Sequence, residues 1–226
     1  MNLVHAMISP EILNKIKKAG VSSKKVKVLE LCTAKNVLDV GCVGQDIDYF
    51  NPDWMHNLIK EVSISIDGVD IDQKGIAHLK ENGYSVYTTE ELQSQKKRYD
   101  IVLMSDVIEH VNDPVAFLSF YSEFLNDIGR MVITTPNAHG IRNFTSIILR
   151  NDYSLNPEHT FWLCPKTMAE VVNRAGLKFE DFFWLKEYYT KKELKGFKNK
   201  CIYSTNSFLQ KIKSNFHPNF MYIISK

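Results

Sequence analysis

The chain has 226 residues, of which 44% are apolar and 24% charged, the composition of an ordinary globular protein with a sizeable core. Its 28 lysines and arginines nearly balance its 26 aspartates and glutamates, and the formal net charge of +2 gives no bulk electrostatic reason to expect a nucleic-acid or membrane partner. No run of about 18 apolar residues is present, so we expect no membrane span.

Cysteine usage and the first residues of the chain indicate a cytoplasmic protein. The four cysteines are scattered and form no CxxC pair, which fits a reducing compartment. Polar residues interrupt the N-terminal segment, so we expect no secretory signal. Basic residues cluster at 15–27 and 186–200, and we interpret both clusters as solvated helix faces. The oligomeric state stays open.

The first half of the chain is predicted to alternate between helices and strands. Residues 1–35 are expected to form a helical N-terminal segment, since apolar side chains recur there at roughly helical spacing. Residues 36–41 are an apolar run ending in glycine, typical of a buried parallel strand. Further elements are expected as helices over 54–62 and 73–82 and as strands over 63–69, 84–87 and 100–105.

The second half begins with an amphipathic helix. Pro114 lies in its first turn, Gly129 is expected to end it, and residues 131–134 form a fifth strand. Residues 136–164 show no clear period, and we expect a long loop with at most one short helix, acting as a substrate lid. Later segments are expected as a helix over 165–175, a strand over 177–185, a variable insertion over 188–216 and a final strand over 220–224.

Strands that alternate with helices at this spacing predict an α/β protein with a doubly wound parallel sheet. Polar motifs follow several of these strands, at the edge where such sheets bind ligands. Gly41 and Gly44 form a turn after the first strand, where the backbone can approach an anionic ligand closely. Asp70 ends the second strand, and its carboxylate can accept hydrogen bonds from a ribose diol. Either feature alone is common in α/β proteins.

The later motifs carry ionisable groups. Asp106, Glu109 and His110 stand within five residues after the fourth strand. Three ionisable side chains so close together at a strand end are unusual for a surface segment without a function. The fifth strand ends in Thr135-Pro-Asn137, and the segment Glu158-His-Thr-Phe-Trp162 follows later in the chain. These side chains are expected to point into the same crevice as the glycine turn.

In this order the motifs resemble the class I S-adenosylmethionine-dependent methyltransferases, over about residues 36–185 and the final strand. The resemblance is carried by VLDVGC at 37–42, GVDID at 68–72, YDIVLMSDVIEHV at 99–111, ITTPN at 133–137 and AGL at 175–177. It implies a Rossmann-like, mostly parallel seven-stranded sheet with an antiparallel C-terminal strand, in a single domain over 1–226. It also implies S-adenosylmethionine as the cofactor, with residues 1–35 capping it.

The resemblance further implies roles for single residues. Asp39 and Gly41 would line the methionine end of the cofactor, and Asp70 would bind the ribose hydroxyls. Ile71 would pack on the adenine, while Ser105 and Asp106 would flank the sulfonium and the acceptor. The remaining residues expected at the cofactor are Cys42, Gly44 and Thr88.

The sequence departs from the family in two places. Val43 and Gln45 stand where further glycines are usual, and Thr88 or Thr89 stands where an acid often contacts the adenine amine. These departures keep open the alternative of a non-catalytic, cofactor-binding regulatory homologue. An NAD-type Rossmann protein is disfavoured, because Gly-x-Gly-x-x-Gly is missing.

Asp106-x-x-Glu109-His110, with His159 later, also resembles a motif that holds a divalent metal. The motif occurs in small-RNA 3′-end 2′-O-methyltransferases and ubiquinone-pathway O-methyltransferases. A metal held by these four residues would lower the pKa of a hydroxyl acceptor. The alternatives are His110 or His159 as a general base or orienting group, with Asp106 beside the acceptor, or a purely structural role.

The expected reaction is SN2 transfer of the sulfonium methyl group to an acceptor oxygen, in a site that contributes alignment and desolvation. We expect a small-molecule, glycan or nucleotide-linked acceptor. The alternative is an RNA ribose 2′-O-methyltransferase with a divalent metal, against which the near-neutral charge argues. The aromatic residues expected as lid walls, unless they belong to the core, are Phe144, Tyr153, Phe161 and Trp162. His56 is expected at a surface or helix position.

Overall fold

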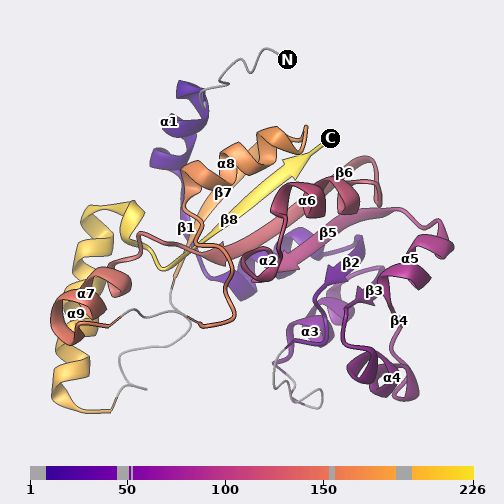
Figure 1. The fold of residues 1–226 in the computed structure, drawn as a ribbon, viewed down its shortest axis with the longest axis horizontal. Coiled ribbons are helices and arrows are strands. Elements are labelled where there is room, and N and C mark those ends of the chain that lie inside the picture. Colours follow the sequence, from indigo (N-terminus) through magenta and orange to yellow (C-terminus); the bar gives the residue numbers. More distant parts are fainter. Residues whose placement is uncertain (1–8, 45–50, 52, 153–155, 187–194) are drawn as a thin grey trace.

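The computed structural model describes residues 9–44, 51, 53–152, 156–186 and 195–226 (Figure 1). Gln45 and Tyr153, and parts of the expected N-terminal segment and variable insertion, lie outside these ranges. The strands are β1 (Val21–Ser22), β2 (Asn36–Val40), β3 (Ser65–Val69), β4 (Val86–Tyr87), β5 (Tyr99–Ser105), β6 (Leu125–Pro136), β7 (Lys178–Leu185) and β8 (Asn219–Ser225).

The helices of the described residues surround these strands. They are α1 (Pro10–Lys18), α2 (Lys24–Cys32), α3 (Met55–Val62), α4 (Gln73–Glu81), α5 (Thr89–Gln95), α6 (Pro114–Ser122), α7 (Ile141–Arg150), α8 (Pro165–Arg174) and α9 (Phe197–Ile212), with 3₁₀ turns η1 (Ile108–His110) and η2 (Ser214–Phe216). In the part of the chain that the structure describes, no helix combines the length and apolar character needed to cross a membrane.

The strands form one sheet in the order β1-β7-β8-β6-β5-β2-β3-β4. Strands β2 to β6 pair in parallel, whereas β8 runs antiparallel to both β6 and β7. The predicted Rossmann-like, mostly parallel sheet with an antiparallel C-terminal strand is confirmed. The strand number differs from the predicted seven, because β1 adds an eighth strand within the segment expected to be helical and pairs with β7.

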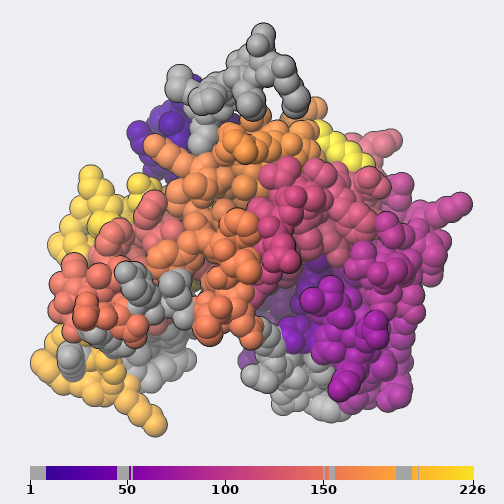
Figure 2. Space-filling model, in the orientation of Figure 1, coloured from indigo at the N-terminus to yellow at the C-terminus, as the bar shows by residue number. Residues whose placement is uncertain are grey.

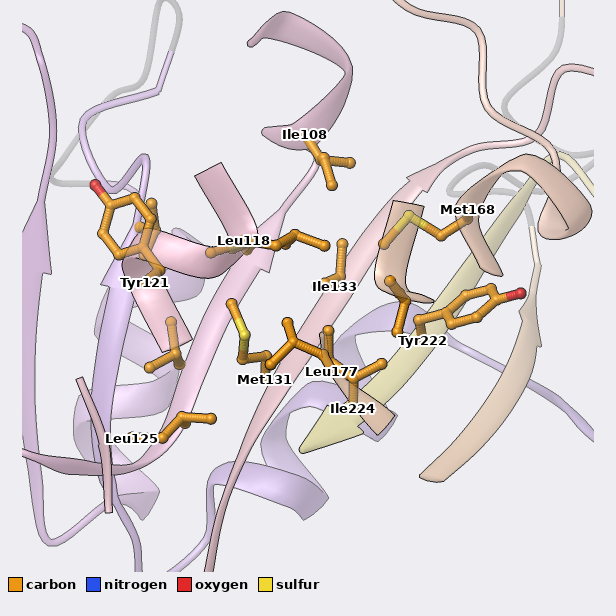
Figure 3. Close-up of a cluster of buried hydrophobic side chains, with 14 of the residues drawn as sticks. Ile108, Leu118, Tyr121, Leu125, Met131, Ile133, Met168, Leu177, Tyr222 and Ile224 are labelled. Carbon is orange, nitrogen blue, oxygen red and sulfur yellow. The ribbon is translucent and has the colours of Figure 1, made fainter. Parts of the chain in front are cut away.

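Apolar side chains from both faces of the sheet build the core. On one face Ile16 of α1, Leu118 of α6 and Met168 of α8 pack against the strands, and Figure 3 shows part of this cluster. On the other face Val28 of α2 and Ile59 of α3 form a second cluster. Because both faces are covered, the strands that carry the site are held between two helical layers.

The expected boundary at Gly129 is wrong. Helix α6 ends at Ser122, and Gly129 lies inside β6, which already begins at Leu125. A Cβ on Gly129 would lie 2.8 Å from the carbonyl oxygen of Tyr99, so glycine is needed here for close strand packing. Beside it the pairing of β5 with β6 shifts register between Tyr99 and Ile101.

Two other segments also differ from the expectation. The strand expected over 84–87 covers only Val86–Tyr87 (β4). Thr88 caps the unpredicted helix α5, and its hydroxyl accepts from the Glu91 N–H in a capping box. Within the segment described as a variable insertion, Phe197–Ile212 forms the sixteen-residue helix α9. The helix expected within 136–164 is present as α7.

Candidate active site

A cavity of about 1310 Å³ lies at the carboxyl ends of the central strands, with Val40, Val69, Ser105 and Pro136 in its wall. These residues end β2, β3, β5 and β6, so the cavity occupies the edge where open parallel sheets bind ligands. Figure 2 shows the surface hollowed between the orange segment near residue 160 and the purple part of the chain. The volume suffices for a cofactor and a small acceptor together.

The turn after β2 depends on two glycines with left-handed backbone. Gly41 has φ +77° and Gly44 has φ +62°, and both line the cavity. A Cβ on Gly41 would lie 2.6 Å from a methyl group of Val107, so no other residue fits without displacing the turn after β5. The predicted close approach of the backbone to the cavity is therefore built into this turn.

The bulky side chains of this turn are accommodated by glycines elsewhere. Val43 is 2% exposed, and a Cβ on Gly75 of α4 would lie 2.3 Å from its Cγ1. Likewise a Cβ on Gly68 of β3 would lie 2.5 Å from the sulfur of Cys42. Cys42 and Val43 therefore fill the space beside the turn, and the glycines at positions 68 and 75 leave room for their side chains.

Asp70 follows β3 and fixes the same turn. Its Oδ2 accepts from the Val43 N–H at 2.9 Å, and its Oδ1 accepts from the Ile71 and Asp72 N–H groups at 2.7 and 3.0 Å. The carboxylate also lines the cavity, where its other lone pairs can accept from a ligand. Beside it the Ile71 side chain is 92% exposed, an apolar surface next to a carboxylate.

Asp39 is held by a residue that sequence analysis placed differently. Its Oδ2 lies 2.9 Å from Nδ1 of His56, and both side chains are buried in the cavity wall. Of the two positions expected for His56, the helix position is confirmed, since it lies on α3, whereas the surface position is wrong, because it is only 1% exposed and stacks on Trp54. A single histidine on a helix gave no sequence signal for this pairing.

Asp106 forms an ion pair that sequence analysis missed. Lys24 Nζ lies 2.6 Å from Asp106 Oδ2, and Thr134 Oγ1 donates to Asp106 Oδ1 at 2.8 Å. Asp106 has φ +57°, a conformation that costs a non-glycine residue about 1 kcal/mol or more. Lys24, the first residue of α2, is buried, so the expectation of a solvated face fails at this lysine.

Glu109, His110 and His159 form a compact group in the cavity wall. Each offers a donor atom within 4.8 Å of the others, and the two imidazole rings meet edge to face at 4.7 Å. Glu109 is 1% exposed; burial raises the pKa of its carboxyl to about 8, and Asp106 adds to the rise. Its Oε2 accepts from Thr135 at 3.0 Å, while Oε1 has no hydrogen-bond partner among the described residues.

His159 reaches this group because its loop is tied to η1. Thr160 donates from its N–H to the Glu109 carbonyl at 2.9 Å and from its hydroxyl to the Val111 carbonyl at 2.8 Å. The buried Nδ1 of His159 has no hydrogen-bond partner in the described part of the chain. Burial lowers the pKa of the His159 imidazole and His110 lowers it further, so the ring is neutral near pH 7.

The cavity wall contains nearly all residues that the sequence predicted as cofactor-binding, catalytic or metal-binding. These are Asp39, Gly41, Cys42, Gly44, Asp70, Ile71, Ser105, Asp106, Glu109, His110 and His159. Thr88 is not in the cavity wall; it caps α5. Asp106 lines the cavity but pairs with Lys24, and the compact group of possible metal ligands does not include it.

The segment 136–164, expected to act as a lid, contributes different residues to the cavity wall than expected. Pro136, Asn156, Glu158 and His159 line the cavity from this segment. Phe144, Phe161 and Trp162 are each more than a third exposed, and in the described structure they are not part of the cavity wall. Phe144 instead meets the ring of Phe216 at 6.4 Å, so the α7 aromatic packs toward η2.

Residues 14–181 match the family described as a methyltransferase domain, most of the chain's length. The chain belongs to this family. A ubiquinone biosynthesis O-methyltransferase of Cereibacter sphaeroides is 26% identical over 170 residues, which cover 66% of this chain and 65% of the relative. A probable S-adenosylmethionine-dependent methyltransferase of Mycolicibacterium smegmatis is 28% identical over 154 residues, 66% of this chain and 54% of the relative. The matches thus span less than two thirds of these relatives.

Solved methyltransferase structures superpose on a larger part of this chain than the sequence matches cover. A crystal structure of an S-adenosylmethionine-dependent methyltransferase from Archaeoglobus fulgidus superposes with a TM-score of 0.59 at 21% identity, covering 89% of this chain and 92% of that one. A cyclopropane synthase from Mycobacterium tuberculosis gives a TM-score of 0.54 at 12% identity, covering 90% and 83%. At these identities the likeness concerns the fold.

Proposed function

We propose that this protein is an S-adenosylmethionine-dependent methyltransferase that methylates an oxygen of a small-molecule, glycan or nucleotide-linked acceptor. One observation carries the proposal. A single cavity joins the glycine turn and Asp70 to the buried group of Glu109, His110 and His159. The family membership and the relatives named as O-methyltransferases support oxygen as the methylated atom.

The cavity residues fit the cofactor. Gly41 keeps the strand end open to a ligand, and Asp70 presents carboxylate oxygens suited to a ribose diol. The exposed Ile71 side chain supplies an apolar face for adenine, and buried Asp39 offers a negative group for an amine. When bound, S-adenosylmethionine supplies an electrophilic methyl group; the chain's own residues bind, orient and exclude water.

The acceptor hydroxyl must lose its proton, and His159 is the best-placed base. Burial lowers the pKa of its imidazole, so the ring is neutral near pH 7, and the residue lines the cavity. A positioned base of this kind contributes about 10²–10⁴-fold to the rate. In this proposal Glu109 and His110 orient His159, and the Lys24–Asp106 pair fixes the neighbouring wall.

Glu109, His110 and His159 also fit a divalent cation. A carboxylate and two imidazoles are a common ligand set, and two of their buried donor atoms, Glu109 Oε1 and His159 Nδ1, have no hydrogen-bond partner in the described residues. A cation held there would lower the pKa of the acceptor hydroxyl. Activity that survives excess chelator would exclude a required metal and leave His159 as the base.

Calorimetry with S-adenosylmethionine and its demethylated product tests the cofactor. We expect both to bind, Asp70→Ala to weaken binding at least about tenfold, and Asp127→Ala, outside the cavity, to leave it unchanged. Labelled methyl transfer is then measured to hydroxylated benzoates, sugar nucleotides and a short RNA. Binding of neither cofactor form would overturn the proposal. Transfer to RNA alone would favour the ribose methyltransferase, and binding without transfer the regulatory homologue.

A further inference from the structure

Helix α9 turns apolar side chains toward solvent. Phe197 is 84% exposed, Phe208 62% and Ile212 56%, and Cys201 is exposed as well. At about 100° per residue these four positions fall within about 60° of the helix circumference. The opposite side of the helix carries Asn206, which is 3% exposed. The apolar stripe is therefore not the face with which α9 packs on the protein.

Helix α7 exposes further apolar side chains beside α9. It contacts α9, and the two helices lie together at the left of Figure 1. The exposed apolar residues of α7 are Phe144, Ile147, Ile148 and Leu149, with Ile148 77% exposed. We call the exposed residues of α7 and α9 together the α7–α9 surface. Apolar patches of this kind on soluble proteins usually mark a binding surface.

The charges on these helices have one sign. Residues 141–149 and 195–213 contain no aspartate or glutamate. They contain basic residues at Arg142, Lys195, Lys198, Lys200, Lys211 and Lys213. Lys200 and Lys211 flank the apolar stripe on one side of α9, at about 60° and about 40° from Phe197. Lysines in this position can lay their stems along apolar surface and hold their charges in water.

We propose that the α7–α9 surface binds the surface of an anionic phospholipid bilayer. The apolar stripe would enter the interfacial region, and the lysines would pair with lipid phosphates. A second copy of this chain is the poorer occupant, because two such surfaces would bring like charges together. The proposal goes beyond methyl transfer and needs no assumption about the acceptor.

Vesicle co-sedimentation of the full chain tests the proposal. We expect binding to vesicles of phosphatidylcholine with 30% phosphatidylglycerol, and weak binding to phosphatidylcholine alone. The double variant Phe197→Ser/Phe208→Ser should lower the partition coefficient at least about tenfold. The double variant Lys200→Gln/Lys211→Gln should lower it about 30-fold on anionic vesicles. A matched control is Ile64→Ser/Ile128→Ser, whose isoleucines are 70% and 85% exposed elsewhere.

A second measurement places the contact on the stripe. A fluorophore on Cys201, in a Cys164→Ser background, should shift to the blue with anionic vesicles, since Cys32 and Cys42 are buried. The proposal would be overturned if the natural protein did not sediment with anionic vesicles, or if the control variant lost as much binding as the stripe variant. It would also be overturned by a dimer, seen in light scattering, that dissociates in the Phe197→Ser/Phe208→Ser variant while vesicle binding is absent. All variants should keep the natural far-ultraviolet circular dichroism.

Discussion

At the scale of single residues, the proposed chemistry depends on His159, which lines the cavity and whose Nδ1 has no hydrogen-bond partner among the described residues. His159→Ala should lower kcat by about 10²–10⁴-fold, because the acceptor then loses its base. The dissociation constant for S-adenosylmethionine should stay within about twofold. Steady-state kinetics and calorimetry measure the two quantities, and His78→Ala, on the exposed face of α4, is the matched control. An unchanged kcat in His159→Ala would refute this role.

The Lys24–Asp106 pair gives a second prediction. Lys24→Gln should destabilise the protein by about 2–3 kcal/mol, because it leaves the Asp106 carboxylate partly buried without its cation. Asp106→Asn should cost a comparable amount, and the double variant less than the sum of both. Urea unfolding measures the three free energies. Strictly additive costs would show that the two side chains do not depend on each other.

The limit of sequence reasoning is visible in these residues. Asp106, Glu109 and His110 could be predicted because they stand together after one strand. Lys24 and His56 could not, since each comes from a helix far from its carboxylate in sequence and belongs to no local motif. Lys24 and His56 meet their carboxylates only in the folded protein, where the sheet brings the helices and strand ends together.

At the scale of elements, the turn after β2 and helix α4 fit each other. Alanine in place of a helical glycine usually stabilises by about 1 kcal/mol. Gly75→Ala should do the opposite, since its Cβ would lie 2.3 Å from Val43 Cγ1 and push the turn toward the cavity. We expect affinity for S-adenosylmethionine to fall about tenfold. Adding Val43→Ala should restore it; failure of this rescue would contradict the packing argument.

The junction of η2 and β8 predicts a pH dependence. Burial lowers the pKa of His217 to about 4, and Lys186 adds to this. The unfolded chain, with a histidine pKa near 6.5, binds more protons between these values, so stability rises with pH there. Acidification from about pH 6.5 to 4 should cost about 2–3 kcal/mol through this group. In urea titrations His217→Phe, which can still stack on Trp184, should flatten this slope relative to the natural protein.

Element boundaries were predictable where apolar period and caps agreed. Helix α4 begins after the Asp72 cap and ends before Gly83, as expected. Helix α5 escaped prediction because TEELQSQ has one buried residue and no apolar period. Gly129 was wrongly predicted to end helix α6, because a glycine required by strand packing has the same local signature as a helix end.

At the scale of the whole molecule, cofactor binding should stabilise the fold. At one hundred times its dissociation constant, S-adenosylmethionine should add about 2.7 kcal/mol to the free energy of unfolding. For a chain of this size the midpoint should rise by about 5–10 °C in differential scanning fluorimetry. At the same cofactor concentration, a tenfold weaker Asp70→Ala variant should gain only about 1.4 kcal/mol, roughly half of the natural rise or less. An undiminished rise in this variant would place the cofactor elsewhere.

The net charge does not show how the charged residues are distributed over the whole molecule. A value of +2 predicts no attraction to a membrane, yet the basic residues of α7 and α9 stand apart from the acids of the cavity. The fold, in contrast, was predictable at this scale, since alternating strands and helices leave few parallel arrangements. The surface could not be predicted, because 188–216 carried no assigned helix whose faces could be compared.

The place of β8 has a consequence for folding kinetics. This strand, the last of the sequence shown, lies between β6 and β7 and pairs with both. Until it arrives, the facing edges of β6 and β7 stay open, and β1 has only β7 to join. Such non-local closure is slow, on the order of milliseconds to seconds. During that interval the open edges can pair with other chains, so refolding yield should fall as protein concentration rises.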